Sequence, residues 1–136
     1  MRVLGVDYGD ARIGIAMSDE LEILASPVET YKSQSMRKDI DYIANIAKKN
    51  NCGKIVIGLP LNMNGTEGAR VEKTKAFGSV LERVSGLPVV YKDERLTTVQ
   101  VERAFDMGNL KKDKRKQIVD RTAAVLILQS YLDTKI

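Results

Sequence analysis

Three acidic positions in this sequence have the residue type and the placement that could support catalysis. Asp7 ends one apolar segment, the neighbours Asp93 and Glu94 end another, and Asp120 falls early in the last predicted helix. Each also has a plain structural interpretation: a turn former, a solvated strand end, or an acid favoured near a helix N-terminus. Because neighbouring strand residues point to opposite faces, only one of Asp93 and Glu94 can face a given site.

Three carboxylates brought together repel one another unless a divalent cation neutralises them. Mg²⁺ suits such a site because it takes hard oxygen ligands and keeps several waters, and Mn²⁺ is the alternative. Two ions about 4 Å apart can activate a water and stabilise the leaving oxygen of a phosphodiester. This chemistry needs no histidine. The chain contains none, which excludes Ser-His-Asp triads, Cys-His pairs and histidine-bound zinc.

The elements that would position these acids follow from the apolar periodicity. The predicted strands cover residues 2–8, 12–18, 22–30, 54–58 and 88–92, and the predicted helices cover about 36–52, 69–85, 97–107 and 117–132. An antiparallel start followed by strands that alternate with helices predicts an α/β protein. Its single mixed sheet has five strands, an antiparallel meander and then parallel strands, with helices packed on it.

The last predicted helix could bring Asp120 to the strand ends. Ala123, Ala124 and Ile127 follow Asp120 by three, four and seven residues, so all four share one helical face. Two alanines on that face would allow the helix to approach the sheet closely. We therefore expect this helix to aim Asp120 at the strand ends rather than at solvent.

The composition is that of a globular protein. The chain has 136 residues, of which 43% are hydrophobic and 29% charged, close to the commonest single-domain size. We expect one domain over residues 1–136. A single cysteine, Cys52, cannot form an internal disulfide and fits a reducing compartment. The apolar run 123–128 is far short of the ~20 residues that span a bilayer, so we expect a cytoplasmic protein with no membrane partner.

Positive charge is concentrated in one short segment. The net charge is +4, and residues 111–116 hold five cations in six positions. This run is either a solvated loop between helices or a mobile clamp for phosphates, in which each contact adds affinity that depends on salt and not on sequence. In the second interpretation Lys112, Lys114 and Arg115 bind substrate. Aromatic residues make up only 5% of the chain, which favours recognition of backbone and shape over base stacking.

Four segments resemble the motif blocks of the YqgF family, bacterial ribonuclease H-like proteins described as Holliday-junction resolvases and as pre-16S rRNA nucleases. The segments are residues 7–14 (DYGDARIG), 58–67 (GLPLNMNGTE), 93–98 (DERLTT) and 119–124 (VDRTAA). They span nearly the whole chain and keep the order of the family's blocks. The resemblance implies a ribonuclease H-like fold and a nuclease activity.

The resemblance also implies which residues form the site. It gives Asp7, Glu94 and Asp120 as catalytic residues and metal ligands. Most other ribonuclease H-like nucleases carry an acid at the end of the strand that is predicted here over residues 54–58, where this chain has Gly58. Glu94 would have to replace that acid from the next strand.

The loop over residues 58–67 should border the substrate, according to the same resemblance. Pro60 and two Asn-containing turns would hold this loop beside the strand ends, where α/β sheets usually bind ligands. We expect Asn62 to contact the substrate backbone or a metal-bound water. Arg95, next to Glu94, is a further candidate for substrate binding.

These observations predict a metal-dependent endonuclease acting on structured nucleic acid, and the resemblance favours processing of the 5′ end of pre-16S rRNA. One alternative is a Holliday-junction resolvase acting on branched DNA. Another is a non-catalytic module for nucleic-acid binding or ribosome assembly, which the glycine at position 58 favours. An actin-like or sugar-kinase-like ATPase needs two domains around its nucleotide, and we expect only one here. The sequence leaves the oligomeric state open, and a homodimer is compatible with it.

Overall fold

The computed structural model describes residues 1–61, 64–94 and 112–134, and over residues 112–122 it describes the helical backbone alone. The elements in chain order are β1 (Arg2–Tyr8), β2 (Arg12–Ser18), β3 (Ala25–Lys32), α1 (Met36–Lys49), β4 (Cys52–Leu59), α2 (Ala69–Ser85), β5 (Val89–Asp93) and α4 (Lys112–Thr134). Among the described residues, none of the helices combines the length and apolarity that crossing a membrane requires.

The five strands form one mixed sheet in the order β3-β2-β1-β4-β5. β1 pairs with β2 and β2 with β3 in antiparallel fashion, whereas β1 pairs with β4 and β4 with β5 in parallel. The carboxyl ends of β1, β4 and β5 therefore meet at one edge of the sheet. This confirms the predicted architecture, an antiparallel meander followed by parallel strands.

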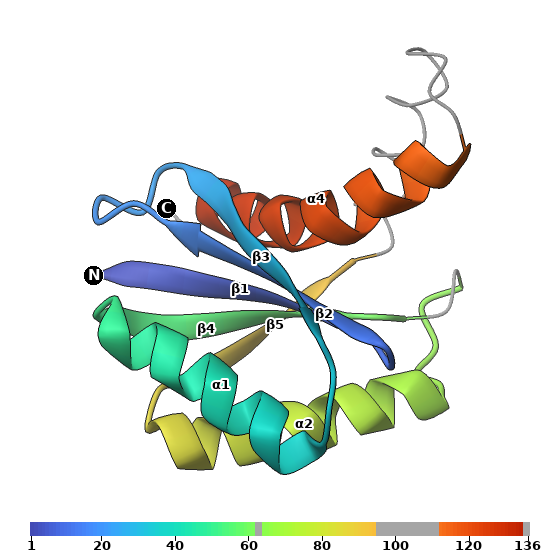
Figure 1. Ribbon diagram of the computed structural model, residues 1–136, viewed down its shortest axis with the longest axis horizontal. Helices are drawn as coiled ribbons and strands as arrows, with labels where there is room; N and C mark the ends of the chain where they lie inside the picture. The colour runs from blue at the N-terminus through green and yellow to red at the C-terminus, as the bar shows by residue number, and fades with distance from the viewer. Residues whose placement is uncertain (62–63, 95–111, 135–136) are drawn as a thin grey trace.

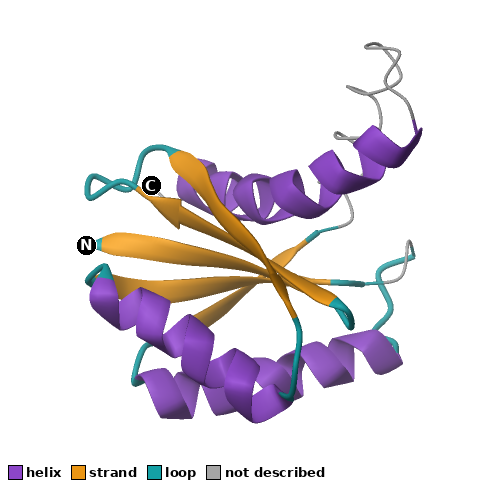
Figure 2. Cartoon of the chain, viewed as in Figure 1, coloured by secondary structure: helices purple, strands orange, loops and turns teal. Residues whose placement is uncertain are grey.

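Helices cover both faces of the sheet, α1 and α2 on one and α4 on the other (Figure 1, Figure 2). The side chains of β1 alternate between these two layers. Leu4 and Val6 face the layer of α1 and α2 and pack with Phe77 and Leu81 of α2. Val3 faces α4 instead, in a core that includes Val56, Ala124, Ile127, Leu128 and Leu132. The hydrophobic alternation of the central strand thus decides which residues of β1 share a face with α4.

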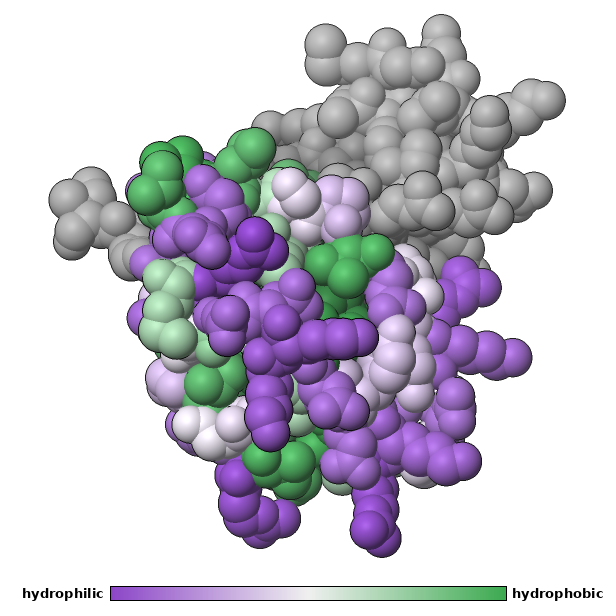
Figure 3. Space-filling model, turned by 60° about the vertical axis from the view of Figure 1, so that its left-hand side comes forward, coloured by the Kyte–Doolittle hydropathy of each residue, from purple (hydrophilic) through white to green (hydrophobic). Residues whose placement is uncertain are grey.

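Local sequence explains where the first two helices begin and end. α1 starts after Ser35, whose hydroxyl accepts a hydrogen bond from the backbone N–H of Lys38, as expected of a serine N-cap. α2 ends at Gly86, whose φ of 73° is left-handed and suits glycine. In the space-filling view, hydrophilic side chains cover most of the lower part of the molecule, where these two helices lie, with apolar patches between them (Figure 3).

The predicted boundaries needed one substantial correction. α4 begins at Lys112, not near residue 117, so residues 112–116 continue the helix and do not form a mobile loop. Lys, Arg and Gln are good helix formers, and neither Gly nor Pro interrupts the segment. Charge repulsion was therefore a poor guide to its conformation. The helix predicted over residues 97–107 lies outside the described residues.

Candidate active site

Asp7 lies at the carboxyl end of β1, on the face of the sheet that α4 covers. Val3 and Gly5 precede it at spacings of four and two residues and face the same way. A Cβ on Gly5 would lie 2.7 Å from the Cβ of Leu128 and 3.1 Å from the carbonyl oxygen of Ala124. The close approach of α4 predicted from the alanine pair is therefore confirmed, and Gly5 is the strand residue that permits it.

Glu94 follows β5 and turns toward the same face. Lys92, two residues earlier, points to α4, because its Nζ donates a hydrogen bond to Oγ1 of Thr134 at 3.4 Å. Side chains two residues apart in a strand point the same way, so Glu94 faces α4 as well. The backbone N–H of Glu94 donates to the carbonyl oxygen of Leu59 at 3.3 Å, so the end of β5 stays attached to the end of β4. Of the neighbours Asp93 and Glu94, it is Glu94 that faces the α4 side.

The Glu94 carboxylate occupies the space above Gly58. A Cβ built on Gly58 would lie 2.5 Å from Oε2 of Glu94. Gly58 belongs to β4, between β1 and β5, and follows Ile57, which pairs with Val6 of β1. Glu94 thus brings a carboxylate against Gly58 from the end of the neighbouring strand, and its role in place of an acid of β4 stays a prediction.

The two acids influence each other electrostatically. The pKa of Glu94 is raised to about 7, mostly by burial and next by the negative charge of Asp7, while the positive charge of Arg70 acts in the opposite direction. A half-buried carboxyl group next to a second acid is protonated more easily than a solvated one, because both effects disfavour its charged form. This edge of the sheet is therefore suited to a positively charged ligand.

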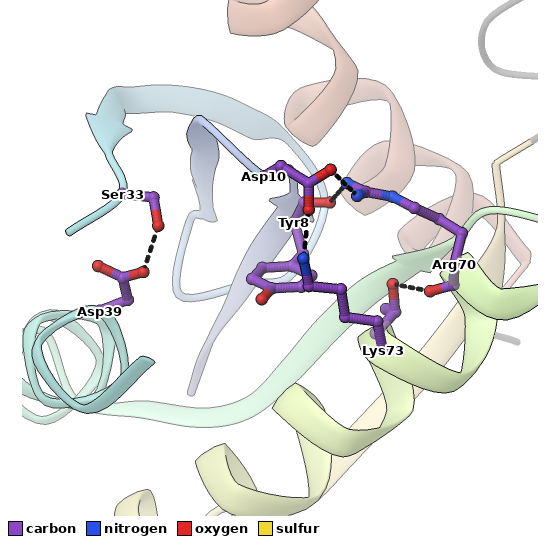
Figure 4. Close-up of polar contacts among 7 residues, drawn as sticks. Tyr8, Asp10, Ser33, Asp39, Arg70 and Lys73 are labelled. Carbon is purple, nitrogen blue, oxygen red and sulfur yellow. Dashed lines mark hydrogen bonds and ion pairs between the residues drawn. The ribbon is translucent and has the colours of Figure 1, made fainter. Parts of the chain in front are cut away.

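Basic side chains reach the same edge from the opposite layer (Figure 4). Arg70, in the first turn of α2, donates a hydrogen bond from Nη2 to the carbonyl oxygen of Tyr8 at 3.0 Å. Arg70 and Lys73 both contact the carboxylate of Asp10, at 2.7 and 2.5 Å. Arg70, Lys73 and Asp10 were not among the predicted site residues, and the i, i+3 spacing of the two cations was the one signal available in the sequence.

Comparison with known proteins settles the family. The family model described as RuvX, Holliday junction resolvase, matches residues 1–134. The chain belongs to the RuvX family. This confirms the resemblance to YqgF proteins that the four motif blocks suggested. Two relatives whose names describe them as candidate pre-16S rRNA nucleases come from Heliobacterium modesticaldum, 45% identical over 99% of this chain and 91% of the relative, and from Endomicrobium trichonymphae, 48% identical over 97% and 95%.

Solved structures confirm the ribonuclease H-like fold of this RuvX protein. RuvC of Thermus thermophilus, in a complex with a Holliday junction substrate, superposes with a TM-score of 0.59 over 98% of this chain and 97% of that one. The sequence identity is 16%, so this likeness concerns the fold alone.

The structure brings two of the three predicted acids of this RuvX chain together, Asp7 and Glu94. Asp120 belongs to the helical backbone of α4, but its side chain lies outside the described residues. The same holds for the side chains of Lys112, Lys114 and Arg115, and residues Asn62 and Arg95 lie wholly outside. Their roles remain predictions.

The donor set at this edge fits a hard divalent cation. Asp7 and Glu94 offer carboxylate oxygens from two strands of one sheet, the ligand type that Mg²⁺ and Mn²⁺ take in proteins. Within the described part of the chain, no three acidic or cysteine side chains gather around one point. Asp120 stays the predicted third ligand.

Proposed function

We propose that this RuvX protein is an endonuclease that hydrolyses phosphodiester bonds in structured nucleic acid and depends on Mg²⁺ or Mn²⁺. The observation that carries the proposal is the carboxylate pair: Asp7 and Glu94 lie on one face at one edge of the sheet, and the Glu94 carboxylate stands over Gly58. In this proposal Asp7, Glu94 and Asp120 hold the cation.

The chain's own residues determine how such a cation would be held. The sheet fixes the ends of β1, β4 and β5 relative to one another, and Gly58 leaves room for the Glu94 carboxylate. α4 packs closely on this face, with the side chain of Ile127 against Gly58, and a partly buried position strengthens electrostatic interactions. A bound divalent ion supplies charge neutralisation and activation of water for phosphodiester hydrolysis.

The substrate that we propose is the 5′ region of pre-16S rRNA. The support is the name shared by relatives that are 45–48% identical over nearly the whole chain. This role would place the protein in the cytoplasm. Branched DNA is the second candidate, because the family model is described as a Holliday junction resolvase. Both substrates present closely spaced phosphates, so the same carboxylate pair serves either one.

The deciding experiment supplies purified protein and Mg²⁺ or Mn²⁺ with a pre-rRNA leader and a four-way DNA junction in parallel. We expect cleavage of the leader, and cleavage close to background for Asp7→Asn and for Glu94→Gln, because each variant loses a ligand of the ion that activates the water. Asp41→Asn, an exposed acid of α1, is the matched control and should cleave normally. Preferential cleavage of the junction would favour the resolvase.

Binding without any metal-dependent cleavage would instead favour a non-catalytic module. The glycine at position 58, in place of an acid, favours that alternative. The placement of Glu94 over Gly58 weakens it, because the space that an acid of β4 would fill holds a carboxylate after all.

A further inference from the structure

A cluster of charged side chains lies beside the acid pair. Arg70 and Lys73, one turn apart in α2, both contact Asp10 in the turn between β1 and β2 (Figure 4). The side chains of Arg70, Lys73 and Asp10 are 36%, 51% and 65% exposed. Water screens ion pairs this exposed, so they are weak. Another anion can therefore compete with the Asp10 carboxylate.

Arg70 is held in place by contacts other than the one with Asp10. Its Nη2 donates to the carbonyl oxygen of Tyr8, and its guanidinium carbon lies 6.0 Å from the centroid of the Tyr8 ring. That ring stacks on buried Phe77 at 4.1 Å. The backbone and an aromatic layer thus orient the guanidinium while Nη1 faces Asp10. A planar guanidinium with an available N–H group is well matched to a phosphate.

The cluster also lies close to the acid pair. Tyr8, which Arg70 contacts, directly follows Asp7, and the positive charge of Arg70 acts on the carboxyl group of Glu94. Two acids at the edge of the sheet repel a polyanionic substrate. Cations on the neighbouring surface would offset this repulsion and draw the backbone toward the site.

We propose that Arg70 and Lys73 form a subsite for a backbone phosphate of nucleic acid, and that the Asp10 carboxylate occupies this subsite as an internal anion when no substrate is bound. The ligand class, a nucleic-acid phosphate, rests on the proposed function. An incoming phosphate displaces Asp10 from Lys73 and from Nη1 of Arg70, whereas the bond from Nη2 to Tyr8 remains.

A purely structural role for the cluster makes the opposite prediction for one variant. If Asp10 only fastened the turn between β1 and β2 to α2, Asp10→Asn would loosen the edge of the sheet and weaken binding. If Asp10 competes with phosphate, Asp10→Asn frees both cations and strengthens binding. The direction of the change therefore separates the two roles.

The experiment measures binding of a labelled RNA duplex by fluorescence anisotropy in EDTA, so that cleavage does not contribute. We expect Asp10→Asn to tighten binding roughly two- to fivefold, and Lys73→Gln and Arg70→Gln to weaken it by a similar factor. The slope of log affinity against log salt should fall by roughly 0.7–0.9 for each phosphate that the variant no longer binds. Thermal melts establish that each variant is folded, and Lys73→Gln serves as the test if Arg70→Gln is not.

Two matched controls correct for the change in net charge. Lys75→Gln removes the same charge from the same helix, and Lys75 is likewise in an exposed ion pair, with Glu67 at 2.7 Å. Glu20→Gln removes an exposed negative charge in the connection between β2 and β3. Because β1 and β2 are antiparallel, this connection lies near the amino end of β1, away from the acid pair. The proposal is overturned if Asp10→Asn binds no more tightly than Glu20→Gln, or if Lys73→Gln binds as well as Lys75→Gln.

A second probe separates this proposal from the proposed function. If the wild-type protein binds no nucleic acid, the proposed function fails, and inorganic phosphate then tests the subsite directly. We expect phosphate to shift the side-chain NMR signals of Arg70 and Lys73, at lower concentration in Asp10→Asn than in the wild type. Unchanged signals at both side chains would overturn the subsite.

Discussion

Gly58 matters at this site because it has no side chain. The carboxylate of Glu94 stands where a Cβ on Gly58 would be, and the side chain of Ile127 closes the same space from α4. Any larger residue must displace one of these two neighbours. The acid therefore reaches its position only because the neighbouring strand leaves room for it.

Replacing Gly58 by alanine tests this dependence. The added methyl group forces Glu94 or Ile127 to move, and overpacking of this kind costs about 1–3 kcal/mol of stability. A displaced carboxylate should lower cleavage by roughly 100-fold, the cost of a misplacement of about 1 Å. Gly53→Ala in the same strand is the control, because the three atoms nearest to its Cβ all belong to the flexible Met1 side chain, the first of them 3.0 Å away. Full activity and stability in Gly58→Ala would show that Glu94 does not need this space.

The raised pKa of Glu94 predicts a pH dependence of stability in the metal-free protein. The unfolded chain releases this proton near the ordinary value of 4.5, whereas the folded protein releases it at about 7. Between these values the folded state binds more protons, so the free energy of unfolding falls as pH rises, by up to roughly 3 kcal/mol. Urea unfolding in EDTA from pH 4 to 8 should show this fall for the wild type but not for Glu94→Gln. A difference between the two proteins that stays constant with pH would contradict the shift.

At the scale of elements, the packing of α4 on β1 decides how the site is covered. Gly5 brings the helix backbone close to the sheet at Ala124. The helix continues toward the carboxyl edge as far as Lys112, so the five cations of residues 111–116 stand at or just before its start. Cations at a helix N-terminus oppose the helix macrodipole. A phosphate bound there would relieve that cost.

Neutralising the basic run should therefore affect binding without affecting chemistry. We expect the triple variant Lys112→Gln, Lys114→Gln, Arg115→Gln to bind RNA and DNA several-fold more weakly, by similar factors. Its salt slope should fall by roughly 0.7–0.9 for every phosphate that these cations bind in the wild type. Turnover at saturating substrate should change little, because the acids are intact. Normal binding by the triple variant would show that these cations are only a solvated start of α4. Slower turnover at saturating substrate would show that they take part in catalysis.

At the scale of the whole molecule, strand order brings distant residues to one edge. β4 lies between β1 and β5, and all three run parallel, so Asp7 and Glu94 meet although 86 residues separate them in sequence. The basic pair of α2 reaches this edge from the other layer. Ligands commonly bind at the carboxyl ends of parallel strands for this reason.

Binding of a cation at this edge should stabilise the whole fold. Mg²⁺ at 100 times its Kd should raise the free energy of unfolding of the wild type by about 2.7 kcal/mol, measured by urea unfolding with and without the metal. Asp7→Asn, Glu94→Gln and Asp120→Asn should each lose most of this gain, whereas Asp41→Asn should keep it. An undiminished gain in Asp120→Asn would remove that acid from the metal site.

The sequence alone was enough for the features that depend on local order. The pattern of apolar residues located the five strands, and helical spacing located α1 and α2. The short links of the meander indicated the antiparallel start. The end of the first apolar segment also placed Asp7 at the carboxyl end of β1. These features were predictable because a strand's face pattern and a helix's apolar spacing are written in neighbouring residues.

The contacts that assemble the site were decided only by the tertiary structure. That Glu94 and not Asp93 turns to α4, and that its carboxylate stands over Gly58, depends on the register of β5 against β4. The pairing of Asp10 with Arg70 and Lys73 depends on how α2 crosses the end of β1. Such contacts join residues more than 30 positions apart. Local patterns do not encode them, because they arise only when packing brings separate elements to the same edge.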